Sequence, residues 1–457
     1  MSALDQIRLV ENALLKASEP SIKAIFRLLP EGSQVTCSWK QPWPKIEHVC
    51  FGPSRSVQEN ESGVSRFVKI FKFAHDSDYD SEVSISVTTN HCPSGTVGQS
   101  PEDRAKTKEL LCAFGWNTTC FQILNPGIDR WFSSQGDAVV GYVTQHLIRV
   151  VAGAPVCSLE RLPEIIAEFE KDAQAHGLGV CYFGAEARMR DFTSSRPSYS
   201  TVALGAQPFW SARSFVDAFA ENASLRAQLS RARNKGVTVE EWEPASAERD
   251  PHLRACLDDW IQSRGLPPMH FLVEPETLGA LEGRRLFVAK RGDKPVGFTV
   301  LSPVPERAGY LTEQFVRGHE APNGTVELGL FTAISKALQE GSEYVTMGIV
   351  PLSPHGDLAT GTNPKWMRLL LPWVRAHGRR FYNFDGLDSF KTKFLPDGWE
   401  PIYAISKERQ FSIRTLYAIA SAFGDCSPIL MLAKGFFKAL RQEARWMGVE
   451  SRYPKTR

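Results

Sequence analysis

Alternating apolar and polar residues predict two strands near the start of the chain, at 67–73 (FVKIFKF) and 82–88 (EVSISVT). A period of two places every second side chain on one face, as in a half-buried strand. Apolar residues at helical spacing between positions 7 and 26 predict a helix before them. The stretch 90–104 is rich in turn-forming residues. We therefore expect residues 1–109 to form a separate, small α+β region of unknown role.

From residue 110 the pattern alternates between strands and helices. Strands are predicted at 138–143, 147–152 and 179–183. A helix is predicted before the third strand, because five apolar residues recur at spacings of three and four: Leu162, Ile165, Ile166, Phe169 and Ala173. Gly177 would end that helix.

The same alternation continues in the second half of the chain. Helices are predicted at 215–236, 253–262 and 327–340, and strands at 286–290, 296–301 and 344–349. This mixture is typical of an α+β or mixed α/β fold with two or three domains, and not of a coiled coil or a solenoid. We place one domain at 110–245 and a second at 246–405.

The last segment, 406–457, has apolar residues at helical spacing among five cations: Arg414, Lys434, Lys438, Arg441 and Arg445. Such a basic amphipathic segment can lie on an anionic lipid surface, or its apolar face can pack on the domain. The interleaved cations favour membrane contact.

Composition narrows the class of protein. Of 457 residues, 42% are hydrophobic and 23% are charged, which is typical of a globular protein. No apolar run approaches the roughly 18 residues that cross a bilayer, and the N-terminus lacks the apolar core of a secretory signal. We therefore expect a cytoplasmic protein, with peripheral contact at the cytoplasmic face of a membrane as a further option.

Charge and cysteine usage suggest partners and exclude some sites. The net charge is +2, but residues 360–457 hold 17 Lys and Arg against 8 Asp and Glu. This basic quarter suggests a polyanionic partner, either nucleic acid or an anionic membrane, although a solvated face without a role would look the same. The nine cysteines include no Cys-x-x-Cys pair, so we expect reduced thiols and no metal.

Four segments of the C-terminal half carry a family resemblance. They are 313–327 (EQFVRGHEAPNGTVE), 347–354 (MGIVPLSP), 382–387 (YNFDGL) and 390–403 (FKTKFLPDGWEPIY). In order and approximate spacing they resemble the catalytic domain of lysyl- and alanyl-phosphatidylglycerol synthases, the multiple peptide resistance factor family. Fungal enzymes that aminoacylate ergosterol share this domain.

The resemblance extends more weakly upstream, through 131–137, 153–155 and 231–236, so that it covers about 110–405. The membrane flippase that usually precedes the domain in this family has no counterpart in 1–109, and we expect a soluble form. The resemblance implies a tandem fold of the N-acetyltransferase type. It also implies transfer of an amino acid from the 3′-terminal ester of tRNA to a lipid hydroxyl, with aminoacyl-tRNA as co-substrate and no cofactor.

Several charged residues of these segments are candidates for catalysis. Glu327, with Glu313 nearby in the sequence, could act as a base or hold the α-ammonium group of the aminoacyl substrate. Lys391 and Lys393 would share a face if they lay on a strand, and with Arg317 they could contact tRNA phosphates or an oxyanion. Alternatively, Glu327 only complements a helix dipole and the lysines are surface charges. Without a Ser-His-Asp or Cys-His arrangement, we expect direct transfer with no covalent enzyme intermediate.

Candidate substrate-binding residues lie in the same segments: Ser353, Tyr382, Asn383, Phe390 and Trp399. Ser353 could offer its hydroxyl or serve as a turn residue. Phe390 and Trp399 are better suited to a core than to a lipid contact.

Four cations on the predicted helix 215–236 and at its end are candidates for tRNA binding: Arg226, Arg231, Arg233 and Lys235. They could contact the acceptor-arm backbone independently of sequence, or simply lie where a helix C-terminus favours cations. By contrast, 174–179 (QAHGLG) matches the pyrophosphate loop of acetyl-coenzyme A enzymes at a position where Gly177 is expected to cap a helix C-terminus, so we interpret that match as coincidental.

The leading hypothesis is therefore a lipid aminoacyltransferase that uses charged tRNA. Alternatives are a related transferase acting on a protein or a peptidoglycan precursor, and a non-catalytic module that binds RNA or membrane. The transferred amino acid, the acceptor lipid and the oligomeric state are left open.

Overall fold

The computed structural model describes residues 34–37, 67–73, 81–88, 100–263, 269–356, 364, 366–368, 371 and 384–424. The chain divides into two compact units, Met1–Thr96 and Val97–Arg457. The helix predicted between positions 7 and 26 lies outside the described residues.

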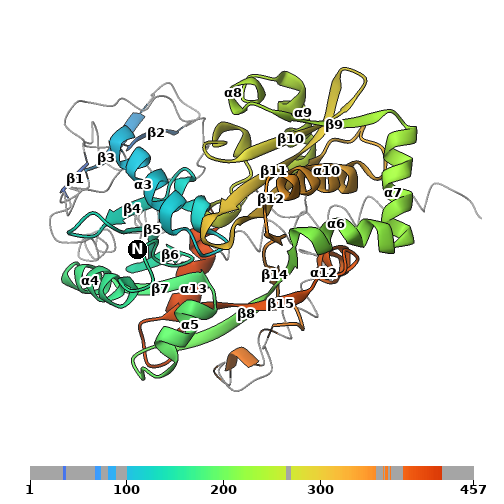
Figure 1. The fold of residues 1–457 in the computed structure, drawn as a ribbon. Coiled ribbons are helices and arrows are strands. Elements are labelled where there is room, and N and C mark those ends of the chain that lie inside the picture. The colour runs from blue at the N-terminus through green and yellow to red at the C-terminus, as the bar shows by residue number, and fades with distance from the viewer. Residues whose placement is uncertain are drawn as a thin grey trace, which may run out of the picture. The chain divides into compact units, whose positions relative to one another are not determined.

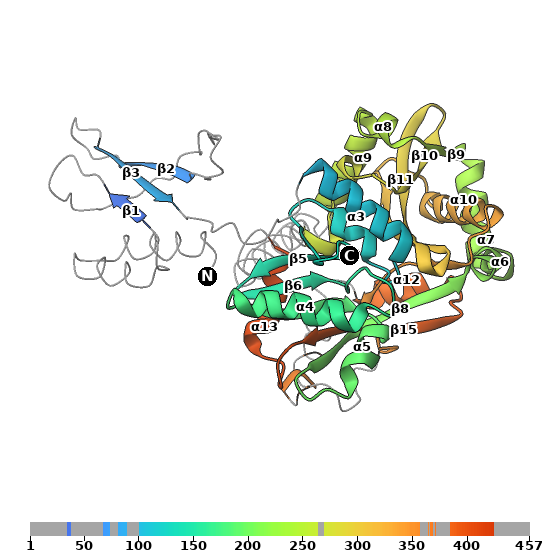
Figure 2. The ribbon, with the colours of Figure 1, turned by 60° about the vertical axis from the view of Figure 1, so that its left-hand side comes forward.

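The described part of the first unit is a three-stranded antiparallel sheet. Its strands are β1 (Gln34–Cys37), β2 (Phe67–Phe73) and β3 (Ser81–Thr88). β3 lies between the other two, as Figure 2 shows. Both strands predicted from the alternating pattern are confirmed.

The second unit contains one arrangement of elements twice. The first copy consists of β4 (Asp129–Phe132), β5 (Val139–Gln145), β6 (Ile148–Ala152), α4 (Leu162–Ala175) and β7 (Gly179–Ala185). The second copy consists of β10 (Arg285–Arg291), β11 (Lys294–Val304), β12 (Gly309–Arg317), α10 (Thr325–Gln339) and β13 (Tyr344–Thr346). In each copy three antiparallel strands lead into a helix, and the next strand pairs in parallel with the third. The predicted α+β class with two tandem halves is confirmed.

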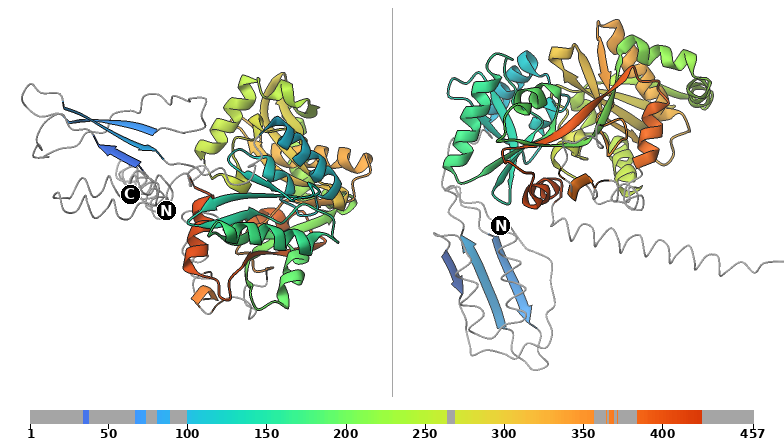
Figure 3. Two further views of the ribbon diagram at one scale, coloured as in Figure 1. Left: turned by 90° about the vertical axis from the view of Figure 1, so that its left-hand side faces the viewer. Right: turned by 90° about the horizontal axis from the view of Figure 1, so that it is seen from below.

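Two long strands join the copies and exchange places. β8 (Ser200–Ser211) follows the first copy along the chain but pairs with β13 of the second. β15 (Gly398–Ser406) follows the second copy but pairs with β7 of the first. β8 and β15 also pair with each other, so one sheet runs through both copies (Figure 3). β14 (Val350–Pro351) pairs with β8, and β9 (Val237–Trp242) lies at the far edge beside β10.

Helices cover the faces of this sheet (Figure 1). Besides α4 and α10 they are α3 (Pro101–Phe114), α5 (Ala187–Ser194), α6 (Ala212–Glu221), α7 (Ala223–Asn234), α8 (Pro244–Ala247), α9 (Pro251–Ser263), α12 (Phe384–Thr392) and α13 (Ile413–Ala422). Short 3-10 turns are η1 (Cys120–Leu124), η2 (Phe271–Val273), η3 (Thr277–Gly279) and η4 (Pro305–Arg307). No helix among the described residues is long and apolar enough to cross a bilayer.

Two predicted elements differ from the structure because side chains interrupt them. The helix predicted at 215–236 is two helices, α6 and α7, separated by Asn222 in extended conformation. Asn222 caps α7 by accepting a hydrogen bond from the Ser224 amide, which is the usual role of asparagine at a helix start. The strand predicted at 344–349 ends at Thr346, where its hydroxyl accepts a hydrogen bond from the Gly348 amide and Gly348 turns with φ of 71°.

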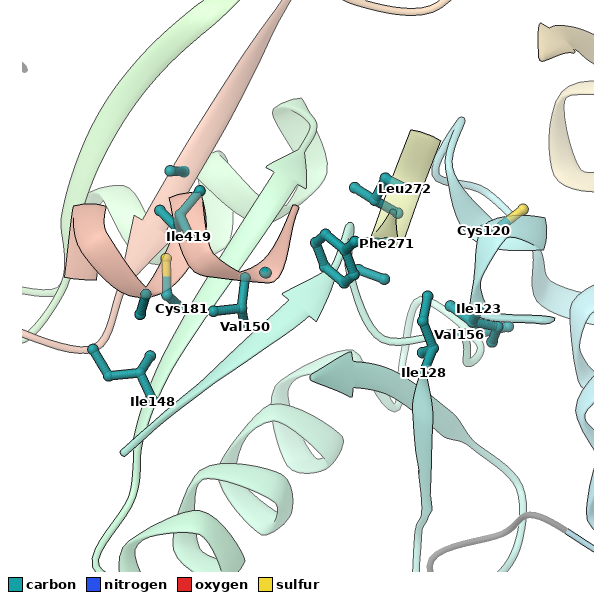
Figure 4. Packing of buried hydrophobic residues seen from close by; sticks show 14 of the residues in the cluster. Cys120, Ile123, Ile128, Ile148, Val150, Val156, Cys181, Phe271, Leu272 and Ile419 are labelled. Atoms are coloured by element: carbon teal, nitrogen blue, oxygen red, sulfur yellow. The ribbon is translucent and has the colours of Figure 1, made fainter. Parts of the chain in front are cut away.

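The start of the C-terminal segment packs on the first copy. Ile419 of α13 lies beside Ile148 and Val150 of β6 and Cys181 of β7 in one buried cluster (Figure 4). From Thr415 to Ala422 the structure therefore shows the packing alternative, and this apolar face of α13 is not available to a membrane. Residues 425–457 lie outside the described residues.

The strand exchange predicts that the first copy does not fold alone. A fragment ending at residue 245 would keep β8 without β13 and β15, and β7 would lose β15. We expect residues 97–245 alone to unfold without a cooperative transition in urea, followed by circular dichroism, whereas residues 97–457 unfold cooperatively.

Co-expression with residues 246–457 supplies the missing strands and should restore a soluble complex with a cooperative transition. An isolated 97–245 fragment that unfolds cooperatively would contradict this account of the sheet.

Candidate functional site

Each copy contains a fork where its two parallel strands separate. β6 and β7 pair as far as Ala152 and Phe183, and β12 and β13 pair only as far as Leu311 and Thr346. Beyond a fork, backbone N–H and C=O groups no longer bond to the neighbouring strand and need other hydrogen-bond partners. The two forks meet this requirement in different ways.

The fork of the first copy is closed by the chain itself. The Gly153 amide still donates to Phe183 O at 2.7 Å, and the Asn117 side chain donates to Gly184 O at 3.3 Å. A Cβ atom added at Gly153 would lie 2.5 Å from Asn117 Oδ1. The Thr118 amide next to it donates to Glu186 Oε1 at 2.6 Å. The segment before η1 therefore fills the space between the separating strands.

The fork of the second copy is held apart by a buried lysine. Lys391 Nζ donates to the carbonyl oxygens of Met347, Gly348 and Ile349 at 2.7, 2.8 and 3.1 Å. These carbonyls belong to the segment that leaves the sheet after β13. Within the described residues, no strand pairs with this edge of β12 beyond Leu311.

The surroundings of Lys391 favour a holding role. The residue is 3% exposed, and burial lowers the pKa of Lys391 to about 7, with Asp388 opposing the shift. Three acceptors surround Nζ, which carries three N–H groups as an ammonium and two as a neutral amine. No N–H of Lys391 is then left for a phosphate or an oxyanion.

The prediction that Lys391 and Lys393 share a strand face is wrong. Lys391 lies in the last turn of α12, and Lys393 follows the end of that helix. On a helical turn, residues two apart point in different directions. Lys393 Nζ accordingly reaches another group, Glu327 Oε1, at 2.7 Å.

The Glu327–Lys393 ion pair lies beside the open fork. Glu327 is in the first turn of α10 and is 8% exposed. Lys393 Nζ lies 4.1 Å from the ring centroid of Phe390, and that ring stacks on Phe315 at 5.5 Å. Phe315 is on β12 beyond the point where β13 departs. The structure therefore brings Glu327, Lys393 and Phe390 together at one place.

This arrangement can support proton transfer and charge stabilisation. A carboxylate can accept a proton from a hydroxyl or bind an amino group, and an ammonium can stabilise a developing oxyanion. The ring of Phe390, stacked on Phe315, lies next to the ammonium of Lys393.

Glu313 lies in another environment. Arg284 Nε donates to Glu313 Oε2 at 2.6 Å, and the Ser302 hydroxyl donates to the same oxygen. Arg284 also donates to Asn125 Oδ1 at 2.8 Å, which ties the second copy to the segment after η1. Burial tends to raise the pKa of Glu313, but Arg284 and the hydrogen bonds hold it below its ordinary value. Glu313 is therefore part of a buried structural ion pair that is separate from Glu327.

Arg317 shapes the loop before α10. Its guanidinium donates to Ala321 O and to Asn323 Oδ1, each at 3.1 Å. These bonds order the turn that leads into the helix start.

Ser353 and Trp399 belong to a second group near Lys391. Ser353 is buried, and its hydroxyl donates to Asp388 Oδ1 at 2.9 Å. Trp399 stacks on His355, with ring centroids 4.1 Å apart. Sequence reasoning missed His355 and Asp388, although both adjoin the conspicuous segments 347–354 and 382–387. Tyr382 and Asn383 lie outside the described residues.

Sequence reasoning also missed a polar network that joins the two copies. Arg307 NH1 donates to both carboxylate oxygens of Glu400 at 2.9 Å, and its other terminal nitrogen donates to Glu186. Gln207 Nε2 donates to Thr118 Oγ1 and to Glu400 Oε2, each at 2.9 Å. Burial raises the pKa of Glu186 although Arg307 opposes the shift. These partners are far apart in sequence, so spacing gave no signal.

The four predicted tRNA-binding cations are exposed on α7 and at its end: Arg226, Arg231, Arg233 and Lys235. The Arg233 guanidinium lies 5.8 Å from the ring centroid of Phe331 on α10, and α7 packs against α10. The basic helix thus adjoins the helix that carries Glu327, on the side where α6, α7, α10 and α12 gather (Figure 1).

The remaining expectations concern glycines and metal ligands. Gly177 follows the C-terminal end of α4 with φ of 68°, so the 174–179 segment ends a helix and does not begin one.

No group of three or more potential metal ligands occurs in the part of the chain that the structure describes.

Comparison with known proteins identifies relatives of most of the second unit. The family model for "Phosphatidylglycerol lysyltransferase, C-terminal" matches residues 113–406. The phosphatidylglycerol lysyltransferase of Bacillus subtilis (strain 168) is 24% identical over 302 residues, which are 64% of this chain and 34% of the relative. An MprF-like domain protein of Mycobacterium tuberculosis is 21% identical over 223 residues, covering 44% of this chain and 46% of the relative. The chain thus spans about a third to a half of these relatives.

Two solved structures share the fold. The DUF2156 C-terminal domain from Agrobacterium fabrum, assigned to a lysylphosphatidylglycerol synthetase, superposes with a TM-score of 0.60 at 19% identity, covering 71% of this chain and 98% of that domain. L-PGS from Bacillus licheniformis superposes with a TM-score of 0.58 at 20% identity, covering 74% of this chain and 96% of that chain.

The holding role of Lys391 predicts a large loss of stability in Lys391→Met. The variant keeps an unbranched side chain, one heavy atom shorter, but leaves three carbonyls of residues 347–349 without their donor, which we expect to cost about 2–4 kcal/mol in unfolding free energy. Urea titration measures the loss. Lys294→Met is the matched control, because its ion pair with Glu320 is half exposed and removing it should cost less than about 0.5 kcal/mol. Equal losses in both variants would rule out the role.

Burial of Lys391 also predicts a pH dependence. Its folded pKa of about 7 lies below the unfolded value of about 10.4. Between these values the unfolded chain binds a proton that the folded chain does not. The stability from this group is therefore complete above about pH 10 and is lost as pH falls towards 7. The difference in unfolding free energy between the natural protein and Lys391→Met should grow from pH 7 to pH 10, and a constant difference would contradict the shifted pKa.

Proposed function

Because the chain belongs to the family of phosphatidylglycerol lysyltransferase C-terminal domains, we propose that it transfers an aminoacyl group from charged tRNA to a hydroxyl of a membrane lipid. The observation that carries the proposal is that the family match spans both copies and includes the open fork with its Glu327–Lys393 pair. The acceptor is a lipid of the phosphatidylglycerol type or another hydroxylated lipid.

The reaction is a direct transesterification. The lipid hydroxyl oxygen attacks the carbonyl carbon of the aminoacyl ester, and a new C–O bond forms as the bond to the tRNA ribose oxygen breaks. Glu327 accepts the proton of the lipid hydroxyl and passes it to the leaving ribose oxygen. Lys393 stabilises the negative charge that develops on the carbonyl oxygen. Ester is exchanged for ester, so positioning supplies most of the catalysis and no cofactor is needed.

The exposed cations of α7 provide the proposed tRNA contact. They lie on the helix that packs on α10, so a tRNA backbone bound there would have its 3′ end within reach of the fork. Such contacts are with phosphates and are independent of base sequence.

The proposal includes a peripheral contact with an anionic membrane on its cytoplasmic face. The acceptor lipid resides in a bilayer, and the excess of Lys and Arg in residues 360–457 is suited to an anionic surface.

A reconstituted assay tests the activity. Purified protein, a mixture of charged tRNAs carrying labelled amino acids and a total lipid extract should yield a labelled lipid, and prior treatment with RNase should abolish it. Label in protein or in a peptidoglycan precursor would identify another acceptor and refute the lipid proposal. Transfer that resists RNase and depends on coenzyme A would refute the use of tRNA.

Glu327→Gln should lower kcat about 10²- to 10⁴-fold, because the amide cannot accept the proton. Glu320→Gln is the control, since Glu320 is half exposed in a surface ion pair, and its activity should be unchanged. Both variants should remain folded in circular dichroism, although Glu327→Gln loses its ion pair with Lys393 and some stability with it. Full activity of a folded Glu327→Gln would exclude Glu327 as the base.

Arg231→Gln combined with Arg233→Gln should weaken tRNA binding about tenfold and reduce its salt dependence, because each lost phosphate contact releases fewer counterions. Filter binding over a salt series measures both. Arg190→Gln, whose arginine is exposed and paired with Asp191 in the first copy, should bind tRNA normally. An unchanged salt slope in the double variant would place the tRNA elsewhere.

A further inference from the structure

Two exposed apolar side chains lie at one end of the sheet, where the β5–β6 turn contacts the start of α13. Ile413 is 73% exposed and Leu147 is 53% exposed. The turn and the helix are joined there, because Arg414 Nε donates to His146 O at 2.9 Å. The His146 ring also packs edge-on against Tyr417, with centroids 4.7 Å apart. Leu147 and Ile413 therefore project from one rigid corner.

The backbone at Leu147 is strained. His146 and Leu147, the two residues between β5 and β6, have φ of 51° and 61°. Tight hairpin turns of this kind favour asparagine and glycine, because a bulky side chain at positive φ is costly. An exposed leucine gains little from internal packing to offset this cost. Internal packing therefore does not account for a leucine at this position.

Two arginines lie close to Ile413 in the sequence, Arg414 directly after it and Arg409 four residues before it. Arg409 and Arg414 are exposed, and within the described residues neither forms an ion pair with a carboxylate. The acids nearby are engaged internally. Glu408 accepts from the Ser412 amide and the Thr415 hydroxyl at 2.9 and 2.8 Å. In the same way, Asp172 pairs with Arg149 at 2.6 Å and Glu170 with Lys407 at 2.8 Å.

The orientation of α13 limits how this region can meet a surface. Its apolar face is buried against β5 and β6, with Ile419 beside Ile148 and Val150 (Figure 4). The helix therefore cannot lie flat on a surface with that face, and only its first turn is available. A contact must be made end-on, by the turn and the helix start together.

We propose that this corner, defined as the tip by Leu147, Arg409, Ile413 and Arg414, docks on an anionic phospholipid bilayer. Leu147 and Ile413 enter the interfacial layer, and the two guanidinium groups contact lipid phosphates. Isolated apolar side chains flanked by cations are suited to such a layer. The inference deepens the proposed function, which requires a lipid acceptor, but the docking is measured without charged tRNA and without turnover.

Co-sedimentation with phosphatidylcholine vesicles containing phosphatidylglycerol tests the tip. The full chain carrying Leu147→Gly and Ile413→Ser should partition to the vesicles about tenfold less than the natural chain, since two apolar contacts are lost. Glycine accepts positive φ without strain, so the thermal midpoint should be unchanged or higher. Loss of binding then cannot be attributed to unfolding.

Leu159→Ser is the matched control. Leu159 is 58% exposed and precedes α4, at the other end of that helix from the tip. This variant should bind vesicles like the natural chain. An equal loss of binding in Leu159→Ser, or undiminished binding by the double variant, would overturn the assignment.

Arg409→Gln with Arg414→Gln should weaken binding and flatten its dependence on salt. Equally tight binding of the natural chain to pure phosphatidylcholine would contradict the role of these cations. In light scattering without vesicles, the natural chain and the tip variants should have the same mass. A dimer that is lost in the Leu147→Gly/Ile413→Ser variant would show that a second copy of the chain covers the tip, and would overturn the proposal.

The two proposals can fail separately. Lipid aminoacylation in detergent micelles should be unchanged in the tip variants, because no bilayer is present. If no aminoacyl transfer occurs but the tip variants still lose vesicle binding, the docking stands and the proposed transferase activity fails. If transfer occurs and the tip variants bind vesicles normally, the docking proposal fails alone.

Discussion

Where a chain leaves a sheet, its backbone carbonyls lose their hydrogen-bond donors and need new ones. The candidate site depends on which group donates to the carbonyls of residues 347–349. Their three carbonyls accept from Nζ of Lys391. This bonding keeps the chain after β13 away from β12, and the edge of β12 beyond Leu311 stays without a strand partner. The same short segment that contains Lys391 and Lys393 brings Lys393 to Glu327. The C-terminal end of α12 thus keeps the fork of the second copy open through Lys391, and the adjacent Lys393 is the cation of the ion pair with Glu327.

The first copy shows what happens when the same topology is used for another purpose. Its parallel strands also separate, but Asn117 fills the space between them. The Thr118 amide next to it donates to Glu186, which holds this segment in place. Arg307 and Glu400 then connect Glu186 to the second copy. The closed fork acts as a structural joint, and the proposed chemistry lies at the open one.

Sequence patterns predicted most strands and helices because their apolar periodicity is local. The positions that failed are those where a distant partner decides the conformation. Lys391 and Lys393 are two apart, which fits a strand, yet the carbonyls of 347–349 and the carboxylate of Glu327 draw them in different directions from a helix end. Glu313 is close to Glu327 in sequence, but Arg284 holds it in a separate buried pair. The spacing of residues in the sequence does not indicate that Arg284 lies beside Glu313.

The exchange of β8 and β15 has a consequence for how such a chain arises. The strand that follows each copy pairs with the other copy, so that β8 pairs with β13 and β15 pairs with β7. Two identical subunits that traded their last strands would form the same sheet, so the topology is that of a domain-swapped dimer whose subunits are fused. Fusion removes the requirement that both subunits keep the same sequence. One copy can then lose its ligand space and specialise as a scaffold while the other keeps the reaction.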